Sequence, residues 1–183
     1  RLGRQLNPAK DILQRGGSID ANLSAEQVDP SQLEGVLNGD HKVAFDRKPV
    51  DGRAIQNNGV IVTLDLGARY GVNRIVFYPR MTEQFPFGNE FMRGYELYLN
   101  DGLPASLFAS GQPNFVSPVR REPGNSDTTV VTEIEPQFVR YLQLKSILNA
   151  GFEIDDKEYP VFLDVIIRVV SQRLFPEIHE LSL

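Results

Sequence analysis

The sequence predicts an all-β protein, folded as an antiparallel β-sandwich. Three segments alternate apolar and polar residues with the period of two that is typical of half-buried strands, namely Val60–Leu66, Val72–Tyr78 and Tyr95–Leu99. Turn residues follow the first segment at Gly67–Gly71 and the third at Asn100–Gly102. In a fold of this kind the loops carry the chemistry, and we expect binding rather than catalysis.

The N-terminal part of the chain predicts short helical elements. Asn7 can cap a helix whose first position is Pro8, and two glycines end that helix. We therefore expect residues 1–18 to form a helical lead or linker. Residues 29–39 predict one or two further helical turns, which stop at an Asn-Gly pair.

The second half of the chain predicts further strands. Residues 103–128 are rich in proline, glycine and serine, and they predict loops with one short strand at Ser106–Ala109. Strands are also predicted at Val130–Ile134, at Tyr141–Lys145 and in the β-branched run Phe162–Val170.

Composition excludes several classes of function. The chain has 183 residues, 41% hydrophobic residues, a net charge of −5 and no cysteine, so no disulfide, thiolate metal site or cysteine nucleophile is possible. The acidic balance disfavours nucleic acid, whose phosphates require a basic face. The chain has no apolar run of membrane-spanning length and no nucleophile-elbow, zinc-protease or phosphate-loop motif. Because the chain begins at Arg1 without an initiator Met, we expect a mature or cut chain, which could be one piece of a longer protein.

An ordered set of motifs carries a family resemblance: NGD at 38–40, VTLDLG at 62–67, VNRIVFYPR at 72–80, RGYELYLNDG at 93–102, VRYLQLKS at 139–146 and EIHELSL at 177–183. Together they resemble the discoidin family, or coagulation-factor type C domains, within the galactose-binding-like sandwiches. The resemblance implies a discoidin-type jelly roll over residues 19–183, with a long insert at 147–175. It also implies a noncatalytic recognition module, on its own or as an accessory domain of a larger enzyme. It places the protein outside the cell, in the periplasm or at the cell surface.

The resemblance further implies that ligands bind loops at one end of the sandwich, here residues 46–58, 80–92 and 111–127. Carbohydrate is the expected ligand, because aromatic rings stack on sugar C–H groups while Arg and Asn hydrogen-bond to hydroxyls. The expected ligand-binding residues are Arg80, Phe85, Phe87, Asn89 and Arg93. The alternative is that Phe85 and Phe91 only plug the end of the sandwich and that Arg80 pairs with a local carboxylate.

Relatives in this family hold a structural calcium ion, and the matching positions here are Asn38, Asp40 and Glu180. Calcium prefers six to eight oxygen ligands, and an Asn carbonyl can serve as one of them. The alternative is a simple helix stop followed by a turn. His41 and His179 could join the acidic residues in a transition-metal site, although both histidines fit ordinary surface positions. No cofactor is required by the sequence.

A different class of function also fits the sequence. The chain could be a structural or assembly domain that docks on a partner protein within a larger exported or cell-surface complex. The absence of tryptophan and the apolar run Phe162–Val170 favour this alternative. Direct membrane binding is not expected, since Glu83 and Glu90 accompany the apolar tip Phe85–Phe87. Those two glutamates could mimic a catalytic carboxylate pair, but acidic loop residues are usually only solvated.

Overall fold

The computed structural model of the chain describes residues 8–9, 12–22, 37, 61–77, 94–147 and 168–170, and the fold is given for these residues. The elements in chain order are η1 (Ile12–Arg15), β1 (Ser18–Ala21), β2 (Ile61–Phe77), β3 (Tyr95–Asn100), η2 (Pro104–Ser106), β4 (Arg120–Glu122), β5 (Val130–Ser146) and β6 (Arg168–Val170). All strand pairs are antiparallel. No helix among the described residues is long and apolar enough to cross a membrane.

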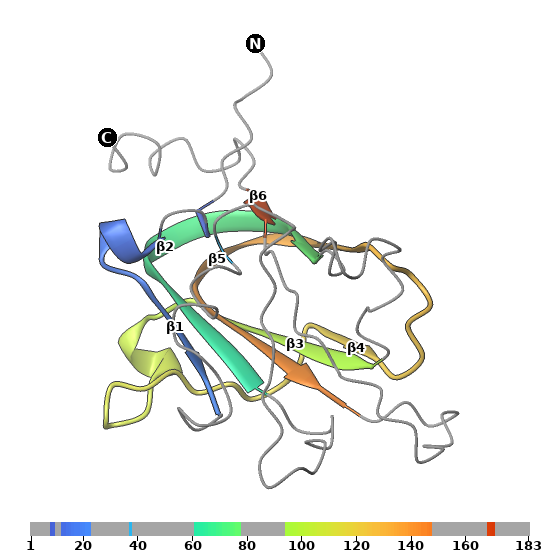
Figure 1. Cartoon of the computed structure of the whole chain (residues 1–183). Helices are drawn as coiled ribbons and strands as arrows, with labels where there is room; N and C mark the ends of the chain where they lie inside the picture. Colours follow the sequence, from blue (N-terminus) through green and yellow to red (C-terminus); the bar gives the residue numbers. More distant parts are fainter. Residues whose placement is uncertain are drawn as a thin grey trace, which may run out of the picture.

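Two long strands, β2 and β5, build the sandwich by bending together. The strands of the sheet lie in the order β1-β2-β5-β3-β4, and β6 pairs with β2. In this order β2 and β5 are neighbours. Their first contact joins Ile61–Asp65 to Tyr141–Lys145, and their last joins Arg74–Phe77 to Val130–Glu133. In between, both strands turn through a corner, so that one continuous sheet forms two facing layers (Figure 1). The predicted antiparallel sandwich is confirmed.

The corner depends on a glycine in the left-handed region. Gly67 has a φ of 77°, a conformation that residues with a Cβ rarely adopt. A Cβ at this position would lie 2.9 Å from the backbone oxygen of Arg15. The pairing of β2 with β5 shifts register between Asp65 and Tyr70. The glycine thus allows the strand to change layer where the chain after η1 passes close by.

The core lies between the two layers, on the inward positions of each strand. In the first layer the alternation is strict, and Val62, Leu64, Leu97, Leu142 and Leu144 are at most 1% exposed. In the second layer Val72 and Ile75 of β2 are three apart, near the register shift between Val72 and Arg74, whereas Val130 and Thr132 of β5 keep the alternation. Ala9, Ile12, Val72, Ile75, Val130 and Val139 complete the core. The residues that flank β1 therefore pack against the same core as the sheet.

Two sequence predictions about strand breaks were wrong. The predicted turn at Gly67–Gly71 is part of the continuous strand β2, and the strands predicted at Val130–Ile134 and Tyr141–Lys145 are joined in β5. The physical reason is the shared corner. Since both strands bend at the same place, backbone pairing resumes at Tyr70 and Val139 instead of ending there.

Other predictions differ in the short elements. The strand predicted at Ser106–Ala109 was wrong: Pro104–Ser106 forms a 3-10 turn, and Leu107 makes one isolated bridge to Pro113. Proline suits the first position of such a turn because it lacks an N–H to donate. The short edge strands β1 and β4 were not predicted. Within the described residues, the predicted helical lead is the single turn η1.

Candidate functional site

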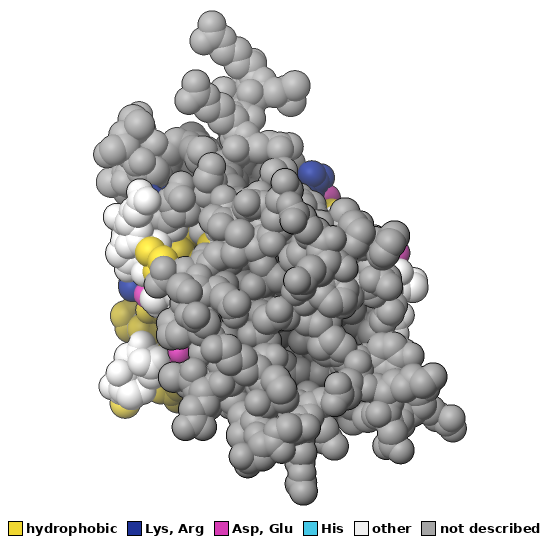
Figure 2. Space-filling view, in the orientation of Figure 1, with side chains coloured by type: hydrophobic (Ala, Val, Ile, Leu, Met, Phe, Trp, Pro, Cys, Tyr) yellow, Lys and Arg dark blue, Asp and Glu magenta, His cyan; other side chains and the backbone are white. Residues whose placement is uncertain are grey.

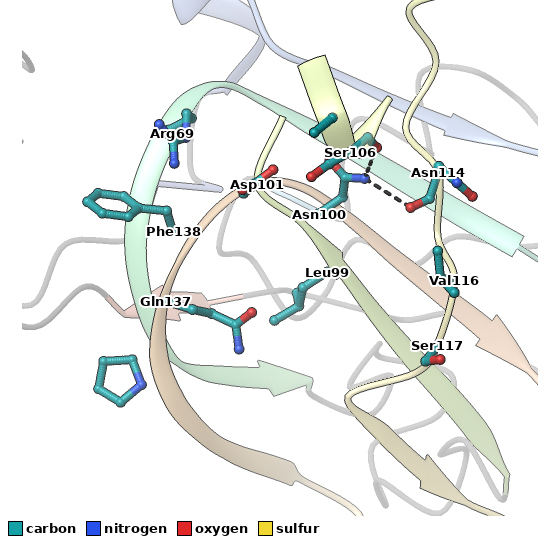
Figure 3. A pocket seen from close by; sticks show the side chains of 12 residues that line it. Arg69, Leu99, Asn100, Asp101, Ser106, Asn114, Val116, Ser117, Gln137 and Phe138 are labelled. Carbon is teal, nitrogen blue, oxygen red and sulfur yellow. Dashed lines mark hydrogen bonds between the residues drawn. The ribbon is translucent and has the colours of Figure 1, made fainter. Parts of the chain in front are cut away.

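An open hollow lies at the corner of the sandwich, and we call it the corner hollow. Its volume is about 610 Å³, within the range of roughly 300–1,000 Å³ that is typical of small-molecule sites. The bends of β2 and β5, the end of β3 and the segment 105–117 supply its walls (Figure 3). The lining residues are Arg69, Leu99, Asn100, Asp101, Ala105, Ser106, Asn114, Val116, Ser117, Pro136, Gln137 and Phe138.

An ion pair braces the corner beside the hollow. Arg140 donates two hydrogen bonds to Asp65, one from Nε at 3.0 Å and one from Nη2 at 3.1 Å. Asp65 also accepts the backbone N–H of Gly67 at 2.8 Å. Hydrogen bonding to Asp65 raises the pKa of Arg140 above its already high ordinary value. This two-point geometry fixes the relative position of β2 and β5 at the bend.

A buried asparagine holds one wall of the hollow in place. Asn100 is 6% exposed, and its Nδ2 donates to the backbone carbonyls of Ser106 at 2.6 Å and Asn114 at 3.0 Å. Its Oδ1 accepts the backbone N–H of Gly102 at 2.8 Å. Figure 3 shows the two bonds that reach across this wall. The side chain of Asn100 therefore fastens the backbone of the segment after β3 to the end of that strand.

Arg69 and Phe138 face each other across the bend. The Arg69 guanidinium carbon lies 4.8 Å from the centroid of the Phe138 ring, close enough for a cation–π contact. The Arg69 Nε is buried, and no acceptor for it is found within the described part of the chain. The same part of the chain offers the rest of this guanidinium no hydrogen bond or ion pair. A positive charge with unused donors thus lines the hollow.

Asp101 supplies the opposite charge on the neighbouring wall. Burial alone would raise the pKa of Asp101, but hydrogen bonds from the Leu103 N–H and the Ser106 hydroxyl, and the nearby charge of Arg69, together lower it below the ordinary value. The Leu103 bond to Oδ1 is 2.9 Å long. Asp101 is therefore ionised at neutral pH. Between Arg69 and Asp101 themselves, the described residues show no ion pair within 4.0 Å.

The chemistry of the corner hollow is that of a binding site for a small polar molecule. Arg69 offers N–H donors, Asp101 offers carboxylate oxygens, and the Gln137 amide offers both a donor and an acceptor. Leu99 and Val116 give the same hollow an apolar part. Among the described residues no three histidine, aspartate or glutamate side chains come together as a metal site.

A second polar cluster lies on the outer face of the first layer, but its members satisfy one another. Glu96 accepts from the Tyr98 hydroxyl at 2.7 Å and from Arg121 at 3.0 Å, and Lys145 lies 3.8 Å away. The Tyr98 hydrogen bond is the largest influence on the pKa of Glu96. Together with Lys145 and Arg121 it outweighs burial, so the pKa lies below its ordinary value. This cluster stabilises the sheet face, with two cations sharing the one carboxylate of Glu96.

The residues that the sequence predicts for ligand binding lie outside the described residues: Arg80, Phe85, Phe87, Asn89 and Arg93. The same holds for the predicted calcium ligands Asn38, Asp40 and Glu180, for both histidines and for the loop 46–58. These assignments therefore stay predictions. The described residues on either side of the segment that holds this loop are Phe77, which pairs with Val130 at the end of β2, and Gly94, whose carbonyl accepts the N–H of Ile147. Neither of them lines the corner hollow, and the hollow and the predicted loop site consist of different residues.

Sequence reasoning did not find the corner hollow. Its predicted loop 111–127 contributes Asn114, Val116 and Ser117, but the charged residues come from segments expected to be plain turns. One signal was present in the sequence. Arg69 stands inside a predicted glycine-bounded turn, and Asp101 stands inside another. Placing the two turns at one corner requires the bend that β2 and β5 share.

No protein-family model matches the chain, and no curated protein matches it. Solved structures share its fold, as three examples show. A family 32 carbohydrate-binding module from Streptococcus pneumoniae EndoD is 14% identical with a TM-score of 0.54, over 86% of this chain and 97% of that one. The module CpGH89CBM32-5 from Clostridium perfringens, solved with GalNAc-β-1,3-galactose, is 17% identical with a TM-score of 0.52, over 75% and 88%.

The third example is chitosan-binding module 2 from a chitosanase/glucanase of Paenibacillus sp. IK-5, solved with chitotriose. It is 8% identical with a TM-score of 0.55, over 88% of this chain and 99% of that one. At such low identities the likeness concerns the fold. The chain thus has the galactose-binding-like, discoidin-type β-sandwich fold of these modules, as the motifs of the sequence predict.

Proposed function

We propose that the chain is a noncatalytic carbohydrate-recognition module. The observation that carries the proposal is the fold: solved carbohydrate-binding modules align with at least three quarters of this chain and nearly all of their own length. Fold alone does not determine function, so the chemistry of the surface matters as well. The described part supplies a concave surface that mixes apolar side chains with paired donors and acceptors, the composition that a sugar requires.

The proposal includes the predicted loop site. Arg80 and Asn89 would hydrogen-bond to sugar hydroxyls, and Phe85 or Phe87 would stack on a sugar face. It also includes the role of an accessory domain in a larger enzyme or surface protein, outside the cell or in the periplasm. The Paenibacillus module derives from an enzyme that carries it, which is consistent with that arrangement.

The test is binding of the purified chain to a broad glycan panel, with and without calcium, beside the variant Phe87→Ala. We expect at least one saccharide to bind, and loss of binding in the variant would locate the site on the loop 80–92. Calcium dependence would support the predicted site at Asn38, Asp40 and Glu180. A panel without any bound saccharide would contradict the proposal.

A second candidate is a docking domain for a partner protein, and one observation favours it. Exposed apolar side chains gather on the segment 103–119: Leu103 is 42% exposed, Phe108 54%, Val116 80% and Val119 40%. In the space-filling view, described hydrophobic side chains reach the surface along one side of the molecule (Figure 2). Such patches can mark interaction surfaces. Light scattering of native extract fractions that contain the chain would give the mass of the species in which it occurs. A mass above that of the free chain would indicate a bound partner.

A further inference from the structure

We propose that the corner hollow is a saccharide-binding subsite, built from other residues than the predicted loop site, and that it takes a neutral sugar unit through two adjacent hydroxyls. The inference rests on the proposed function. It deepens that function by naming the residues and the kind of ligand. Three features carry it: an arginine with unused donors, an aspartate that is ionised but not paired with it, and apolar side chains elsewhere in the lining of the same hollow.

The first feature is the state of Arg69. Its guanidinium rests on the Phe138 ring at 4.8 Å, and its Nε is buried without an acceptor in the described part of the chain. A buried donor without a partner destabilises a fold. Nearby Arg140 shows the contrasting case, because both of its bonds go to Asp65. Arg69 is therefore held in place by a ring. Its Nε is closed off, and the donors proposed for a ligand are its two Nη groups, for which the described residues show no hydrogen bond or ion pair.

The second feature is the separation of charges. Arg69 and Asp101 line the same hollow and influence each other electrostatically. No ion pair within 4.0 Å joins them among the described residues, so they are not a closed salt bridge. One sugar hydroxyl can donate to the Asp101 carboxylate while an adjacent hydroxyl oxygen accepts from Arg69. The two opposite charges leave no net charge in the hollow, which favours a neutral ligand over a sugar acid or an amine.

The third feature is the remaining lining. Leu99 and Val116 offer apolar contacts for the C–H face of a sugar, and Gln137 can donate or accept at a third hydroxyl. Figure 3 shows Arg69, Phe138 and Gln137 coming from the bend, with Asp101 on the end of β3. Asn100 does not take part, because its side-chain amide is already bonded to the backbone. The proposed ligand contacts are thus limited to groups that have capacity to spare.

The experiment is calorimetric titration of the chain with galactose, chitotriose and galacturonate, in the wild type and three variants. Arg69→Gln removes the positive charge and the paired N–H donors of the guanidinium. Asp101→Asn removes the negative charge but keeps an oxygen that can accept from the Leu103 N–H. Arg74→Gln is the matched control. It is the same substitution on the same strand, at an exposed residue paired with Glu133 outside the hollow.

We expect a neutral saccharide to bind the wild type and to bind at least tenfold more weakly to both hollow variants, with Arg74→Gln within about twofold of the wild type. Galacturonate should bind more weakly than galactose. The inference is overturned, and the proposed function kept, if Arg69→Gln and Asp101→Asn bind like the wild type while Phe87→Ala abolishes binding. If no saccharide binds the wild type in the titration or on the glycan panel, the corner subsite and the proposed carbohydrate-recognition function are both contradicted. Thermal melts confirm that each variant is folded.

Discussion

Two arginines at the same corner of the sandwich differ in their hydrogen bonds: one is paired within the fold, and the other has donors left for a ligand. Arg140 places both of its described donor nitrogens on Asp65, and that aspartate also caps the N–H of Gly67. Arg69 lies on a ring and has no acceptor among the described residues. The first arginine is part of the framework. The second is held in place by the fold, and its donors remain for a ligand. Substitution of Arg140 should therefore lower mainly the stability, and substitution of Arg69 should weaken mainly ligand binding.

The largest effect on stability is expected at Asn100, which lines the same hollow as Arg69 but has its hydrogen bonds satisfied. Asn100→Ala leaves the Asn114 carbonyl and the Gly102 N–H without their partner, and each orphaned group costs about 1 kcal/mol or more. The Ser106 carbonyl loses one bond but still accepts the N–H of Asn114. We expect the free energy of unfolding to fall by about 2–3 kcal/mol in urea titration. Asn114→Ala is the control, because Asn114 contributes only its backbone carbonyl to this contact. An equal loss in both variants would contradict the role given to Asn100.

A smaller loss is expected for the brace itself. Arg140→Gln should lower the free energy of unfolding by about 1–2 kcal/mol, because Asp65 loses a charged two-point partner in a partly buried place. Arg74→Gln removes a more exposed pair, with side chains 40% and 56% exposed, and should change stability by less than about 0.5 kcal/mol. Equal effects would mean that the corner pair is no more structural than a surface pair.

The partnered cluster around Glu96 should give stability a dependence on pH. The pKa of Glu96 is lowered in the folded chain from the ordinary value of 4.5, so its contribution is present above that value and is lost as the pH falls through the folded pKa. We expect Glu96→Gln to be less stable than the wild type by about 1 kcal/mol at pH 6. The difference should shrink toward pH 3. A difference that stays constant with pH would exclude a titrating role.

The smallest effect on stability is expected at Arg69. Arg69→Gln loses the contact with Phe138, worth about 0.5–1 kcal/mol at a partly exposed site, but it also removes a buried donor without a partner. The net change in the free energy of unfolding should stay below about 1 kcal/mol. A loss larger than that of Arg140→Gln would show that Arg69 is a framework residue and would remove the contrast between the two.

The sequence predicts the layers of the fold better than it predicts the corner between them. Alternation in the segments Val60–Leu66, Tyr95–Leu99 and Tyr141–Lys145 indicates one apolar face for each strand. Five apolar residues of these segments are buried, namely Val62, Leu64, Leu97, Leu142 and Leu144. Alternation reports which face of a strand is apolar, and it does not report whether a glycine ends the strand or bends it. The turn expected at Gly67 is therefore a bend within β2. The register shift near Val72 likewise has no signal in the sequence.

The candidate site shows the same limit more strongly. Arg69 and Asp101 are 32 positions apart in the sequence, and each stands among turn residues that would fit a solvated surface. They become a pair of opposite charges in one hollow only because β2 and β5 bend together and Asn100 fastens the segment after β3. The predicted loop residues Arg80, Phe85, Phe87, Asn89 and Arg93 lie outside the described residues, and they stay predictions.

The most direct test of saccharide recognition at the corner is nuclear magnetic resonance. The backbone amide signals of the labelled wild type would be followed while a saccharide found on the glycan panel is added. The account predicts progressive shifts that cluster at the amides of Arg69, Asp101, Leu103, Gln137 and Phe138, with little change at β1. Shifts confined to residues away from the corner, or no shifts at any saccharide concentration, would contradict it.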